Sequence, residues 1–138
     1  MPTRKANVLS PTDAAYLAGV IDGEGCFAVS LSSNHIYAAL ELAGCEQAFI
    51  QSLCALAGTG AVARTPFRKP PFRQSYRWRV SLKSSMFLIE QVLPFLKLKH
   101  PQAVLFLQLS SFQPTSVLHS PQQRDLINRI QHLNVRGC

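Results

Sequence analysis

The ten residues YLAGVIDGEG, at positions 16–25, decide the fold of this chain. Together with the residue before them they place Ala15, Gly19 and Gly23 four residues apart, so a helix would carry these residues in one stripe almost free of side chains. A second helix can approach such a stripe backbone to backbone, so two copies of the chain could pack there. The leucine, valine and isoleucine of the segment lie on the other faces and can fill a core.

The start and the end of this helix can both be predicted. Ser10 is a hydroxyl N-cap and Pro11 occupies the first helical position, which predicts a helix from about Pro11 to Glu24. Two carboxylates, Asp22 and Glu24, fall in its last turn, where the helix dipole disfavours each by roughly 0.3–1 kcal/mol. Either a bound cation compensates them, or they belong to a solvated turn.

The rest of the chain predicts two copies of a helix-strand-strand pattern. Apolar and polar residues alternate clearly from Phe72 to Lys83, which predicts a strand with one apolar and one cationic face. The prolines from Pro66 to Pro71 predict an exposed loop before it. The other expected elements are strands at 26–32, 36–43 and 60–65, a helix at 46–57, and later helices from residue 84 or 85, from residue 100 and after residue 120.

The composition bounds the class of protein. The chain has 138 residues, which fits one domain, and 47% of them are hydrophobic, which excludes a disordered chain. Fourteen Lys and Arg against seven Asp and Glu give a net charge of +7, which favours a polyanionic partner such as nucleic acid, although an anionic membrane surface would satisfy the same charge.

The sequence also bounds where the protein works. The four cysteines contain no C-x-x-C pair, which argues against a zinc site. No stretch reaches the roughly 18 apolar residues that a membrane-spanning helix requires, and the first residues lack the apolar core of a signal peptide. We therefore expect a soluble intracellular protein with no membrane partner, in a bacterial cytoplasm or in a chloroplast or mitochondrion.

The central motif resembles that of a known family. LAGVIDGEG, at 17–25, is closely similar to the LAGLIDADG motif of homing endonucleases, and LPFLKLK, at 93–99 and followed by Gln102 and Ala103, resembles the corresponding segment of the compact single-motif members. The resemblance implies one α+β domain over residues 1–138, with a core at about 10–134. The implied fold is αββαββα, an antiparallel saddle-shaped DNA-binding sheet with helices on its other face. One motif per chain implies a homodimer that packs through the helix at 17–25.

The same resemblance implies a function and an active site. The function is site-specific cleavage of both strands of a long, nearly palindromic DNA target, with divalent metal, to leave short 3′ overhangs. Glu24 matches the metal-binding carboxylate, the Gly23 carbonyl is a second oxygen ligand, and Mg²⁺ is the expected ion, with Mn²⁺ as a substitute. Lys99 resembles the basic residue beside the scissile phosphate, with Lys97 as the substitute. The implied dimer interface contains Ala15, Ala18, Gly19, Asp22 and Gly23.

The DNA-binding residues are expected on the sheet. A cationic strand can lie in the major groove, where arginine pairs with guanine and other cations neutralise phosphates. The first hairpin adds polar side chains to the same surface. The full set is Ser30, Ser32, Asn34, Tyr37, Glu41, Arg64, Arg68, Lys69, Arg73, Arg77, Arg79 and Lys83.

Two departures from the family pattern keep alternatives open. The family more often has Asp where this chain has Glu24, which remains an oxygen ligand. Relatives also place a polar residue, often Gln, after the second strand to position water, and alignment puts Leu42 or Ala43 there; the candidate replacements are Glu41, Glu46 and Gln47. A nucleic-acid-binding protein that does not cleave, such as an RNA splicing maturase, or a regulatory DNA-binding protein, are therefore the alternatives.

Overall fold

The computed structural model of the chain describes residues 5–32, 35–66, 73–112 and 120–135. Its helices are α1 (Pro11–Glu24), α2 (Gln47–Ala57), α3 (Leu82–Val92), the short 3-10 helix η1 (Leu93–Phe95), α4 (His100–Ser110) and α5 (Pro121–Asn134). Its strands are β1 (Gly25–Ser32), β2 (His35–Gly44), β3 (Ala61–Arg64) and β4 (Tyr76–Ser81). The predicted order of helices and strands is confirmed.

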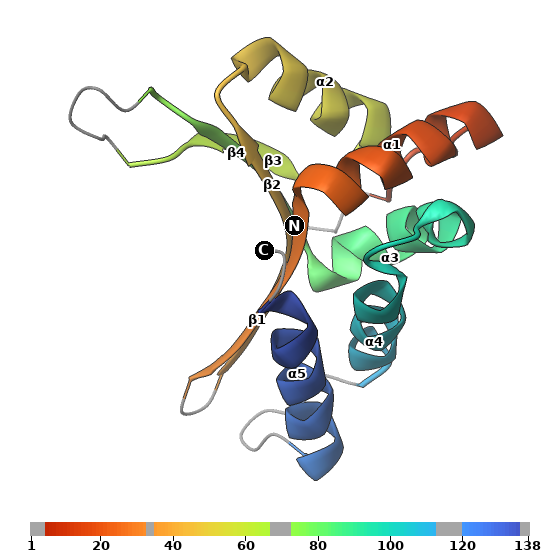
Figure 1. The fold of residues 1–138 in the computed structure, drawn as a ribbon, viewed down its shortest axis with the longest axis vertical. Helices are drawn as coiled ribbons and strands as arrows, with labels where there is room; N and C mark the ends of the chain where they lie inside the picture. Colours follow the sequence, from red (N-terminus) through yellow and green to blue (C-terminus); the bar gives the residue numbers. More distant parts are fainter. Residues whose placement is uncertain (1–4, 33–34, 67–72, 113–119, 136–138) are drawn as a thin grey trace.

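The four strands form one antiparallel sheet in the order β1-β2-β4-β3. The described helices all lie on one side of this sheet, and the sheet curves so that its other face is concave (Figure 1). Phe27 pairs with Leu40, and Leu42 pairs with Trp78, all of them buried, so these positions face the helices. Because side chains alternate along a strand, their neighbours in sequence face the concave side.

Strand β4 is shorter than its alternation predicts. The alternating pattern extends from Phe72 to Lys83, but the strand runs only from Tyr76 to Ser81, and Leu82 already begins α3. Lys83 therefore lies in the first turn of a helix and lines a pocket of about 330 Å³ with residues of α4, on the helical side of the sheet. The prediction that Lys83 belongs to the cationic strand face is wrong.

The core lies between the sheet and the helices. Its largest fully buried side chains include Phe27, Trp78 and Phe106, and the rings of Phe27 and Phe106 are 5.2 Å apart. The Trp78 indole N–H donates to the Thr59 carbonyl at 3.0 Å, next to Gly60, whose φ of 88° suits glycine alone. This packing fixes β3 and β4 against α2.

Helix α5 protects the edge of the sheet. β1 is an edge strand, and side-chain amides of α5 donate to two of its carbonyls, Gln131 to Val29 at 3.0 Å and Asn134 to Phe27 at 2.8 Å. Edge strands otherwise offer their backbone groups to other chains. Across the described residues, no helix is both long and apolar enough to span a membrane.

Candidate active site and nucleic-acid face

The site is built where α1 ends and β1 begins. The Ser10 hydroxyl accepts the Asp13 N–H at 3.1 Å and starts the helix, which ends at Glu24 as predicted. Gly25 follows at once as the first residue of β1, and a Cβ there would lie 2.9 Å from the Ile21 carbonyl oxygen. The last glycine of the motif is therefore needed so that the chain can pass directly from helix to sheet.

Glu24 is exposed at this junction. Its carboxylate makes no hydrogen bond or ion pair with any residue that the structure describes. Gly23 beside it is exposed as well, and the last carbonyls of a helix have no partner within the helix. The junction thus presents a carboxylate and a backbone carbonyl, both oxygen donors, to a ligand.

Asp22 makes different contacts. It is partly buried, and its carboxylate accepts two backbone N–H groups, from Lys97 at 2.8 Å and from Lys99 at 2.9 Å. These bonds fasten the segment after η1 to the end of α1. The assignment of Asp22 to a dimer interface stays a prediction; its carboxylate is already engaged within its own chain.

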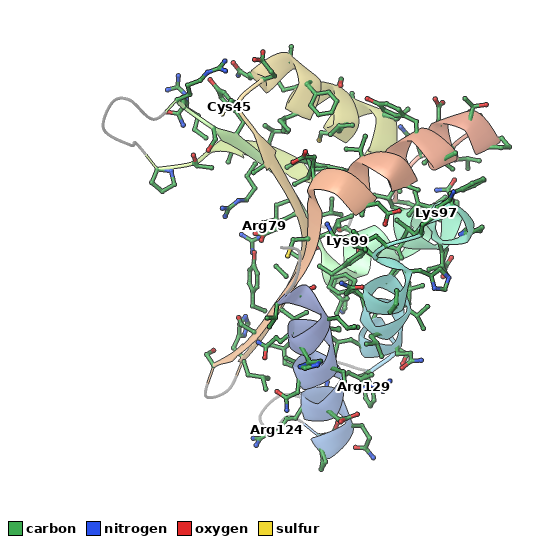
Figure 2. The ribbon with its side chains drawn as sticks, in the orientation of Figure 1. Cys45, Arg79, Lys97, Lys99, Arg124 and Arg129 are labelled. Atoms are coloured by element: carbon green, nitrogen blue, oxygen red, sulfur yellow. The ribbon has the colours of Figure 1, made fainter. Side chains whose placement is uncertain are left out.

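Lys99 is buried and points to the same junction (Figure 2). Its side chain is only 3% exposed, and its ammonium donates to the carbonyl oxygens of Ile21, at 3.2 Å, and Gly25. Burial lowers the pKa of Lys99, while the charges of Asp22 and Glu24 oppose that shift. A cation at a helix C-terminus is favourable, so Lys99 supplies part of the compensation that the two acids need. Lys97, the substitute candidate, is exposed.

The small-residue stripe of α1 faces away from the core. Ala15, Gly19 and Gly23 are exposed, and a Cβ built on either glycine meets no described atom within 4 Å. Packing inside the described chain therefore gives no reason for glycine at these two positions. Ala18 is 0% exposed and packs inside the chain's own core, so its assignment to the dimer interface is wrong.

The concave face of the sheet carries a charged cluster. Arg77 and Arg79 point to this side, opposite the helices, and Figure 2 shows Arg79 there. The Arg79 guanidinium lies 4.6 Å from the centre of the Tyr37 ring. Glu41 accepts the Tyr37 hydroxyl at 2.9 Å and lies 3.7 Å from Arg77. Ser30 pairs with Tyr37 across β1 and β2, so it shares this face, as does the exposed Ser32 at the strand end.

The remaining predicted DNA contacts are more scattered. Arg64 is exposed at the end of β3, and Arg73 precedes β4, where it forms an exposed ion pair with Glu46 at 3.2 Å. A groove of about 510 Å³ lies on the concave face over β3 and β4, and its lining includes Arg64, Arg77 and Arg79. Asn34, Arg68 and Lys69 lie outside the described residues.

Comparison with known proteins identifies this architecture. No family model and no curated protein matches the sequence, but solved structures do. The homing endonuclease I-CvuI, in complex with its target, has a TM-score of 0.70 at 22% identity, over 89% of this chain and 82% of that one. The archaeal intron-encoded homing endonuclease I-Vdi141I, complexed with DNA, gives 0.61 at 12% identity, over 90% and 98%. The LAGLIDADG homing endonuclease I-GzeII gives 0.62 at 14%, over 95% and 45%.

This chain has the LAGLIDADG homing-endonuclease fold. The predicted fold class is thus confirmed. Leu42, one of the two positions where the sequence comparison would place a water-positioning residue, is 2% exposed and faces the core; the other, Ala43, has no polar group in its side chain. The three proposed replacements have other surroundings. Glu41 accepts the Tyr37 hydroxyl, Glu46 pairs with Arg73, and Gln47 is exposed at the start of α2.

One chain of this fold offers few metal ligands. Within the described ranges no three His, Cys, Asp or Glu side chains gather closely enough to hold a metal ion. The donors at the junction are the Glu24 carboxylate and the Gly23 carbonyl. They are oxygen ligands of the kind that magnesium binds, but magnesium fills most of its positions with water and substrate oxygens. The donor set is therefore compatible with a magnesium ion that takes its remaining ligands from water and other oxygens.

Proposed function

We propose that the protein is a site-specific endonuclease that hydrolyses one phosphodiester on each strand of duplex DNA, as a homodimer. The observation that carries this proposal is the exposed carboxylate of Glu24, which has no hydrogen-bond or ion-pair partner among the described residues. It lies at the end of a helix whose outer face carries a stripe of Ala15, Gly19 and Gly23. The fold, the net charge of +7 and the concave cationic sheet agree with it.

The second chain would pack on α1. Ala15, Gly19 and Gly23 offer a surface that a symmetry-related helix can approach closely, as small-residue stripes allow. Two large side chains near this helix are also exposed, Tyr16 at 50% and Leu98 at 67%. A twofold axis along α1 would bring two Glu24 carboxylates together and place two sheets along one duplex, so the target would be nearly palindromic.

The junction residues have distinct tasks in this proposal. Glu24 and the Gly23 carbonyl would hold the divalent ion, magnesium or manganese, which when bound polarises the phosphate and lowers the pKa of an attacking water. Lys99 closes the end of α1 through its hydrogen bond to Ile21, and its ammonium would favour an anionic phosphate beside Glu24. The cut is expected to leave short 3′ overhangs.

The test is Glu24→Gln, which keeps the size of the side chain and removes its charge. We expect loss of double-strand cleavage in magnesium, with binding to the target retained. In mixtures of wild-type and variant chains, mixed dimers should nick a single strand, because each chain serves one phosphodiester. Sequencing of the DNA ends and a nicking assay on plasmid measure both effects.

Glu90→Gln is the matched control, since Glu90 is an exposed glutamate of α3 and does not belong to the α1–β1 junction. It should cut like the wild type. Equal loss of binding and cleavage in folded Glu24→Gln would contradict the catalytic assignment, and double-strand cutting by mixed dimers would contradict the one-strand-per-chain arrangement.

A second candidate function is nucleic-acid binding without cleavage, such as that of an RNA splicing maturase. The apolar residues at the water-positioning site, Leu42 and Ala43, are the observation that favours it. Tight binding to nucleic acid with no metal-dependent cut by the wild-type chain would support this candidate over the endonuclease.

A further inference from the structure

The polar cluster on the concave face is organised around one carboxylate oxygen. Glu41 Oε1 accepts the Tyr37 hydroxyl at 2.9 Å and also lies 3.7 Å from Arg77 Nη1. Tyr37 in turn supports the Arg79 guanidinium, 4.6 Å from its ring centre. The three residues of β2 and β4 that surround Glu41 therefore have restricted positions before any ligand binds.

Two groups of this cluster keep unused hydrogen-bonding capacity. Within the described part of the chain, Arg79 forms no ion pair and Glu41 Oε2 accepts no hydrogen bond. Arg79 and Glu41 are direct partners in the register of β2 and β4. An arginine fork and a carboxylate oxygen therefore stand side by side near the middle of the concave face.

An acid in this place works against phosphate binding. A carboxylate on a cationic face repels the DNA backbone and lowers non-specific affinity. A carboxylate is useful where it meets a base amino group, because cytosine N4 is a hydrogen-bond donor in the major groove. The partner guanine offers its O6 and N7 acceptors to arginine. The neighbouring pair thus complements both members of one base pair.

We propose that Arg79 and Glu41 together recognise a G·C base pair at one position of each half-site, with Arg79 on guanine and Glu41 Oε2 on cytosine. Tyr37 and Arg77 are positioning residues that hold this pair. The inference rests on the proposed function, since it assumes that the concave face binds duplex DNA. It goes further by assigning a base pair to two named side chains.

The experiment is selection from a randomised duplex library by the full-length protein, with calcium in place of magnesium, followed by sequencing. The wild type should enrich a nearly palindromic sequence with a fixed G·C pair at one symmetric position. Arg79→Ala should lower the preference for that pair about tenfold, the scale of one bidentate base contact, and leave the other positions unchanged. Glu41→Gln should weaken the same preference and raise the affinity for unrelated DNA.

The control is Arg124→Ala, which removes the same charge from an exposed site on α5, away from the concave face (Figure 2). It should retain the preference. Thermal melting of each variant establishes that it is folded. A strong consensus that survives both Arg79→Ala and Glu41→Gln overturns this inference alone. Failure of the folded wild type to enrich any duplex overturns the proposed function as well.

Discussion

The foot of α1 and the concave face of the sheet both gather charged side chains, but they hold them differently. At the foot, Asp22 and Lys99 are bound to backbone groups, two N–H groups for the carboxylate and two carbonyls for the ammonium. On the concave face, Glu41 and the arginines are held by other side chains.

The difference separates charges that maintain the fold from charges that are available to a ligand. A buried charge that loses its backbone partners leaves polar groups unsatisfied, which is costly. An exposed ion pair contributes little to stability and can exchange its partner for a base or a phosphate. Glu24 joins the second group although it stands two residues from Asp22, and this is why it is the candidate ligand of the two acids.

The largest effect on stability is expected from Lys99→Met. The substitution keeps much of the side chain's length but removes the hydrogen bonds to Ile21 and Gly25, so the folded state should lose about 2–4 kcal/mol. Chemical denaturation measures this change. Lys97→Met is the matched control, because Lys97 is exposed two residues earlier, and it should cost far less. Equal losses in the two variants would show that the ammonium of Lys99 does not stabilise the helix end.

A smaller effect is expected from Asp22→Asn. The amide keeps one acceptor oxygen but turns an NH₂ group toward the second backbone N–H, so about 1–2 kcal/mol of stability should be lost. Asp125→Asn is the control, since Asp125 is exposed and pairs with Arg129 at 3.8 Å, a surface pair worth less than about 0.5 kcal/mol. If the shift in denaturation midpoint is the same for both, the backbone contacts of Asp22 do not matter for the fold.

The sequence predicted elements better than it predicted contacts. Helix α1 was located at both ends because Ser10, Pro11 and the glycines at its end are local signals. The burial of Lys99 was not predictable, because the alternating run LKLK gives Lys97 and Lys99 the same pattern and only tertiary packing separates them. Lys83 was misplaced for a related reason: the alternation continues past Ser81, but contacts of α3 with the rest of the chain end the strand there.

The same limit applied to the site. The stripe of Ala15, Gly19 and Gly23 followed from helical spacing, and these residues are exposed as expected. The resemblance added Ala18 and Asp22 to the same interface, yet the helix turns Ala18 into the core and Asp22 toward residues that are 75 and 77 positions away. The cluster around Glu41 was hidden because strand register, which brings Glu41 to Arg79, is a property of the sheet and not of either strand.

The smallest expected effect tests the concave face, with Tyr37→Phe. Burial raises the pKa of Tyr37, the hydrogen bond to Glu41 adds to the rise, and the arginines oppose it. A raised pKa means that the folded state favours the neutral phenol, so this contribution to stability is complete below pH 10 and is lost as the pH rises through the folded-state pKa.

Tyr37→Phe should cost about 1 kcal/mol or less at neutral pH, because one partly exposed hydrogen bond is removed, and should reduce the alkaline loss of stability. Urea unfolding at neutral pH and above pH 10 measures both, with the half-exposed Tyr16→Phe as the control for removal of a phenol. An unchanged alkaline loss of stability would mean that Glu41 does not hold Tyr37 in solution. The side chains of the concave face would then lack fixed positions, unlike Asp22 and Lys99 at the end of α1.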